Sequence, residues 1–161
     1  MSGRYYPQKD LDTIEKFNRE LIGEPNISND GFIDQFVILY RPSVYETETN
    51  MYGESSDGKV YQQGVKLPCI VDAEDFDFNI SEFGADNRQN VSFAFQRAYL
   101  VEVDLKPDIG DILKWNEGYF EVNTYNENQL VGGQPDNSHS IVVQAHLTRL
   151  STTNIEQQRG F

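Results

Sequence analysis

The chain has 161 residues, of which 38% are hydrophobic and 12% aromatic, which suits one domain with a core filled largely by Phe and Tyr. Its 26 acidic and 13 basic residues give a formal net charge of −13. Such a charge repels a phosphate backbone and argues against a free-standing nucleic-acid-binding protein. The acidity would instead serve solubility, keep DNA from adhering inside a conduit, or dock a basic partner.

The N-terminal part of the chain predicts one helix. No apolar signal segment or membrane-spanning stretch is evident, so we expect a protein made in a cytoplasm without a membrane partner. Between Pro7 and Ile22 apolar residues recur at helical spacing, and Gly23 and Pro25 end the pattern. The helix would pack either on its own domain or on a neighbouring subunit. The apolar positions are Leu11, Ile14, Phe17, Leu21 and Ile22.

A strand and a long polar segment follow. Residues 32–40 are apolar on both alternating faces, which predicts a strand buried on both sides and ended by Arg41 and Pro42. Residues 43–66 predict a long loop or extended hairpin, either a projecting arm that contacts a neighbour or a mobile solvent loop. We select as candidate subunit-interface residues Tyr45, Met51, Tyr52, Val60 and Tyr61, together with Phe161 at the end of the polar tail.

The middle of the chain predicts further strands. Residues 67–71 form a short apolar strand, and the acidic residues after it lack the turn glycine and bidentate Glu of an EF-hand loop, so we expect no metal. Residues 79–90 allow a short helix or a turn around Phe83 and Gly84. Residues 91–103 alternate apolar and polar side chains and predict the longest strand.

The last third predicts a β-hairpin over residues 111–125, a polar loop to Ser138 and a final strand whose inward face carries Ile141, Val143, Ala145 and Leu147. Residues 151–161 form a polar tail that we expect to order on assembly. The predicted fold is therefore mainly β, an antiparallel β-sandwich or small barrel with one N-terminal helix and a long inserted loop or hairpin. Its parts are residues 1–31, 32–150 and 151–161.

Catalytic machinery is not evident in the sequence. His139 and His146 would lie on opposite faces of a strand, and Cys69 sits among apolar neighbours as a buried structural thiol. We expect no enzyme, cofactor or metal, although paired carboxylates leave a hydrolase open. Trp115, Tyr119 and Tyr125 leave a carbohydrate-binding β-sandwich open, unless they fill the core.

Three stretches carry a resemblance to a known family. They are residues 32–42, residues 80–84 leading into the strand that ends at Leu100, and residues 106–122. The last has a Gly-Asp turn, an apolar strand with the only Trp, and an aromatic return strand. Its candidate structural residues are Gly110, Asp111, Trp115, Gly118, Tyr119 and Phe120. In this layout the chain resembles neck and head-closure proteins of tailed bacteriophages, contractile-tailed phages in particular, although Trp115 stands where Pro or Gly is usual.

The resemblance implies a virion structural protein of the neck, which joins the DNA-filled head to the tail and helps to close the DNA channel. It implies a ring of identical subunits, six by expectation, between portal or adaptor proteins on the head side and tail terminator proteins on the tail side. DNA would pass without sequence-specific binding. The particle would assemble in the cytoplasm of a bacterial host. A tail terminator or a baseplate component is the alternative place in the same particle.

Overall fold

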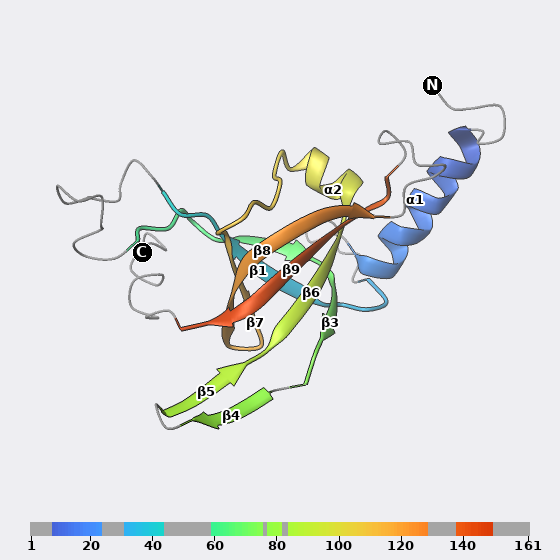
Figure 1. Ribbon diagram of the computed structural model, residues 1–161. Coiled ribbons are helices and arrows are strands. Elements are labelled where there is room, and N and C mark those ends of the chain that lie inside the picture. The colour runs from blue at the N-terminus through green and yellow to red at the C-terminus, as the bar shows by residue number, and fades with distance from the viewer. Residues whose placement is uncertain are drawn as a thin grey trace.

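The computed structural model describes residues 8–23, 31–43, 59–75, 77–81, 84–128 and 138–149. The chain folds into one large antiparallel sheet with a helix beside it and a two-stranded hairpin at one end (Figure 1). In chain order the elements are α1 Gln8–Ile22, β1 Phe36–Tyr40, β2 Val65–Pro68, β3 Ile70–Ala73, β4 Asp77–Ser81, β5 Gly84–Arg88, β6 Asn90–Gln96, α2 Arg97–Glu102, β7 Ile112–Trp115, β8 Gly118–Asn128 and β9 Ser140–Thr148. The prediction of a mainly β fold with an N-terminal helix is confirmed.

The seven-stranded sheet has the order β2-β1-β7-β8-β9-β6-β3. Its two edge strands, β2 and β3, are consecutive in the chain and are separated by Cys69 alone. The sheet must therefore curl until its opposite edges meet at this residue, although hydrogen bonds do not close it into a barrel. Cys69 is fully buried at that corner, and its N–H donates to the carbonyl of Gln35 at 3.0 Å.

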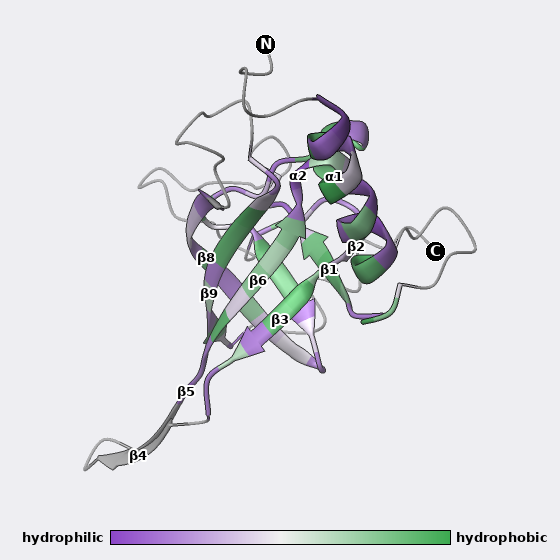
Figure 2. Ribbon diagram, turned by 90° about the vertical axis from the view of Figure 1, so that its right-hand side faces the viewer, coloured by the Kyte–Doolittle hydropathy of each residue, from purple (hydrophilic) through white to green (hydrophobic). Residues whose placement is uncertain are grey.

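The concave face of the sheet holds the main core. Alternate residues of each strand point inward, as in Val91, Phe93 and Phe95 of β6. Tyr99 and Leu100 of α2 join this core at one end of the sheet, and α1 lies beside α2 (Figure 2). A smaller cluster lies on the other face of the sheet and consists of Tyr40, Tyr61, Ile112 and Tyr119, with Ile38 against it.

The predicted long strand over residues 91–103 is wrong beyond Gln96, because the chain turns there into the six-residue helix α2. Tyr99 and Leu100 are adjacent in the sequence, and both are buried. A strand would point their side chains to opposite faces of the sheet, whereas the helix lets both join the same core. Val101, which the alternation placed on the apolar face, is 69% exposed. Among the described strands the longest is β8, with 11 residues.

Three other boundaries differ from the prediction. The first strand begins at Phe36, and Phe32 lies outside it with 91% of its surface exposed. The strand expected over residues 67–71 is two strands, since β2 pairs with β1 whereas β3 pairs with β6 on the opposite edge. The short helix considered within residues 79–90 is wrong, because β4 and β5 form an antiparallel hairpin, which extends from the body in Figure 1.

Candidate interaction surfaces and their structural support

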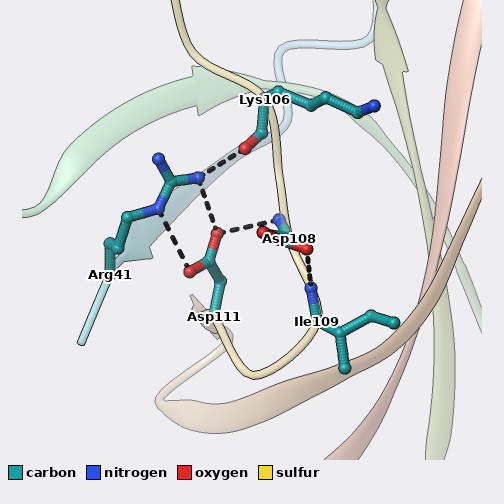
Figure 3. A network of polar contacts seen from close by, with 5 residues as sticks. All are labelled: Arg41, Lys106, Asp108, Ile109 and Asp111. Atoms are coloured by element: carbon teal, nitrogen blue, oxygen red, sulfur yellow. Dashed lines mark hydrogen bonds and ion pairs between the residues drawn. The ribbon is translucent and has the colours of Figure 1, made fainter. Parts of the chain in front are cut away.

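The Gly-Asp turn before β7 is held by a buried carboxylate. Asp111 is 2% exposed, and its Oδ2 accepts hydrogen bonds from the backbone N–H of Asp108 at 2.9 Å and from Nη2 of Arg41 at 3.1 Å. Nε of Arg41 reaches Oδ1 at 3.3 Å, and the same guanidinium donates to the carbonyl of Lys106 (Figure 3). The carboxylate raises the pKa of Arg41 above its ordinary value, chiefly through this hydrogen bond. Arg41 thus ties the end of β1 to residues 106–111.

The backbone of this turn explains its glycine. Gly110 has φ of +90°, a conformation that L side chains rarely adopt. From there its N–H donates to the carbonyl of Val122 at 3.0 Å, and the N–H of Val122 donates back to the carbonyl of Asp111 at 2.9 Å. These hydrogen bonds join the turn to β8, as Arg41 joins it to β1, and together they set the residue at which β7 begins.

The predicted hairpin is confirmed and has a two-residue turn. Trp115 pairs with Gly118, and the residues between them, Asn116 and Glu117, have φ of +45° and +64°. Two positive φ values define the turn type whose twist matches a hairpin, and Asn followed by Gly suits it best. Gly118 serves packing, since a Cβ there would lie 3.1 Å from Cε2 of Phe120.

The aromatic side chains of the hairpin pack into the two apolar clusters, one on each face of the sheet. Trp115 packs edge-on against Phe93, with ring centroids 6.3 Å apart, and lies 6.0 Å from the ring of Phe120. Tyr119 is 5% exposed in the smaller cluster on the opposite face. Trp115, Tyr119 and Tyr125 therefore do not form one exposed stacking platform, and the structure does not support the carbohydrate-binding hypothesis.

The predicted interface residues fall into two groups. Tyr45, Met51, Tyr52 and Phe161 lie outside the described residues. Val60 is half-buried, and its carbonyl accepts from the N–H of Ser43 at 2.7 Å. Tyr61 is 3% exposed and packs within its own domain, where burial raises the pKa of its phenol. In the isolated chain the side chain of Tyr61 is thus not at the surface, and the role of this segment in subunit contact stays a prediction.

Sequence reasoning did not select two aromatic side chains that are largely exposed in the described chain. Phe17 on α1 is 64% exposed and Phe32, just after the helix, is 91% exposed. The helical spacing of Phe17 was visible, but spacing does not tell which part of an apolar stripe packs on the domain. Phe32 was assigned to a strand because the apolar run continues through it into β1.

Within the described residues, no three side chains of His, Cys, Asp or Glu gather as metal ligands would. Cys69 is fully buried, and burial raises the pKa of its thiol to about 12, which suits a structural residue. No helix in the described part of the chain is both long and apolar enough to span a membrane.

Comparison with known proteins gives a structural likeness to a virion chain. No protein-family model matches the sequence, and neither does any curated protein. The fold is similar to that of a solved chain from the virion of a native gene transfer agent particle, with a TM-score of 0.50 and 13% sequence identity. The match covers 73% of this chain and 96% of that one. At this identity the likeness shows a shared fold.

Proposed function

We propose that the chain is a structural protein of a phage-like virion and that within the particle it forms the neck ring between the DNA-filled head and the tail. The observation that carries the proposal is the fold likeness to a virion chain, which extends over 96% of that chain. The sequence resemblance to neck and head-closure proteins points to the same kind of particle. Neither requires a catalytic group, and we propose a structural rather than an enzymatic role.

The supporting geometry is a sheet from which a hairpin projects. The Arg41–Asp111 pair and the hairpin fix the central strands, while the β4–β5 hairpin extends from one end (Figure 1). A sheet domain with a projecting hairpin suits a subunit repeated around a ring, where the hairpin can meet a neighbour. The net charge of −13 would let DNA pass along such a ring without adhering to it.

Deletion of the gene from the phage or prophage tests the proposal. Because a neck ring closes the head and attaches the tail, its loss should give heads that lose DNA and complete tails that stay unattached. Expression of the chain in trans should restore joined particles. Tails of altered length would favour a terminator ring, and heads joined to tails that lack an end structure would favour a baseplate role. Normal, infectious particles without this chain would refute a virion role.

A further inference from the structure

One side of α1 presents large apolar side chains to solvent. Ile14, Phe17 and Leu21 are 43%, 64% and 39% exposed, and they lie on one side of the helix because they are three and four residues apart. Phe32 extends this surface, since its N–H donates to the carbonyl of Glu20 beside the last turn of the helix. A phenylalanine ring buries about 150–250 Å², so the two Phe residues alone expose about 300 Å².

The helix is held to its own domain by a different side. Leu11 and Ile22 are buried, the carbonyl of Glu15 accepts from Nε2 of Gln96 at 3.2 Å, and Arg19 forms an ion pair with Glu102 of α2. These contacts orient the helix and leave its apolar side turned outward. An exposed apolar patch of several hundred Å² on a well-anchored helix marks an interaction surface.

The convex face of the sheet offers a complementary surface. Strand pairing aligns two rows of side chains across β3, β6, β9 and β8 on the face opposite the main core. The first row is Ile70, Ala94, Val142 and Asn126, and the second is Asp72, Ser92, Gln144 and Thr124. Of these eight side chains only that of Asp72 carries a charge, and charged residues are depleted from the centres of interfaces.

The two surfaces are similar in extent. The stripe from Ile14 to Leu21 is about 10 Å long at 1.5 Å per residue, and four strands span about 14 Å. A hollow of about 460 Å³ opens on this part of the sheet, with room for an aromatic ring. Its lining residues are Thr124, Tyr125, Asn126, Val142 and Gln144.

The charges of the two surfaces are compatible with a second copy as the occupant. Two copies at −13 repel each other overall, so contact between them is least opposed where each surface is nearly neutral. The helix satisfies this condition, because α1 carries three basic and four acidic residues. The two sheet rows, with Asp72 as their only charge, satisfy it as well.

We propose that the apolar side of α1, formed by Ile14, Phe17, Leu21 and Phe32, docks on the convex β3-β6-β9-β8 face of a second copy of this chain. The contact joins two different surfaces, so it propagates from copy to copy around a ring. This proposal rests on the proposed ring architecture, and it identifies the two faces through which neighbouring subunits of the ring would meet. Because the attraction is apolar and the net charges repel, added salt strengthens the contact.

Cross-linking of the full chain tests the contact. Leu21→Cys and Gln144→Cys place thiols on the two surfaces and keep both exposed Phe residues, while native Cys69 stays buried. Mild oxidation of an equal mixture should give a covalent dimer, and either variant alone should give no covalent dimer. Lys16→Cys, exposed on another side of α1, replaces Leu21→Cys as the matched control and should not cross-link with Gln144→Cys.

Sedimentation velocity at increasing protein and salt concentrations supplies the second readout. Phe17→Ser and Phe32→Ser should each weaken self-association by about tenfold or more, whereas Lys16→Ser leaves it unchanged. Both Phe side chains are mostly exposed, so circular dichroism should report an unchanged fold.

Three results would overturn the proposal. One is cross-linking of Leu21→Cys with itself, which means that helix packs on helix. Another is a mixture that yields no more covalent dimer than the Lys16→Cys control. The third is a chain that stays monomeric at every concentration and salt, which leaves the patch to a different protein. All three results come from the isolated chain, whereas the virion location is tested by gene deletion. The contact can therefore be refuted while the virion location stands, and the virion location can be refuted while the contact stands.

Discussion

Removal of the Asp111 carboxylate should destabilise the domain far more than removal of an exposed carboxylate. Asp111→Ala deletes the acceptor of three hydrogen bonds, one from the N–H of Asp108 and two from Arg41. Hydrogen bonds to charged groups contribute about 1.5–3 kcal/mol, and loss of one partner of a buried pair costs about 3–5 kcal/mol. The Arg41 side chain is 37% exposed and can turn to water, so we expect a cost of about 3 kcal/mol.

Urea unfolding followed by the fluorescence of Trp115 measures this cost, because the only Trp of the chain packs in the aromatic core. In thermal unfolding, the same cost should lower the melting temperature by about 6–12 °C for a chain of this size. Glu102→Ala is the matched control, since it removes an ion pair with Arg19 whose side chains are 31% and 52% exposed. Such a pair contributes at most about 1 kcal/mol. Equal costs for the two variants would refute the assignment of Asp111 as a structural anchor.

Three further predictions concern single positions. Glu117→Gly should stabilise the hairpin by about 0.5–1 kcal/mol in the same urea assay, because Glu117 has φ of +64°, and Glu117→Ala should give no such gain. Gly64→Ala should cost about 1–3 kcal/mol, because its Cβ would lie 2.6 Å from Cγ2 of Ile38, and an unchanged urea midpoint would contradict this packing. Burial raises the pKa of the Cys69 thiol from 9.0 to about 12, so as the pH rises the unfolded chain loses the thiol proton before the folded chain does. Its contribution to stability is complete below pH 9 and should fall by up to about 1.4 kcal/mol per pH unit between pH 9 and 12. Cys69→Ala should lack this alkaline loss, and equal slopes for both proteins would contradict it.

The sequence predicted those features that depend on neighbouring residues. The hairpin over residues 111–125 follows from alternation around a short turn, and α1 ends where Gly23 adopts φ of +87°. The residues of α2 were misassigned because Tyr99, Val101 and Val103 alternate as in a strand, and short apolar runs fit both patterns. Tertiary packing of Tyr99 and Leu100 decided between the two.

Features that depend on distant residues could not be predicted. Arg41 and Asp111 are 70 residues apart, and nothing local pairs them. The break at Cys69 arises because β2 and β3 find partners on opposite edges of the sheet, although the run of apolar residues through them looks continuous. Likewise, the spacing of Leu11, Phe17 and Ile22 predicts a helix but not which of them meets solvent, since the domain covers only one side.

Immunogold electron microscopy of gradient-purified particles, with antibody against this chain, tests the proposed neck location most directly. The neck assignment predicts label at the junction of head and tail. Label confined to the tail tip would place the chain in the baseplate and contradict the neck assignment. Particles without label, when the antibody binds the same chain after mild disruption of the particles, would contradict a virion role altogether.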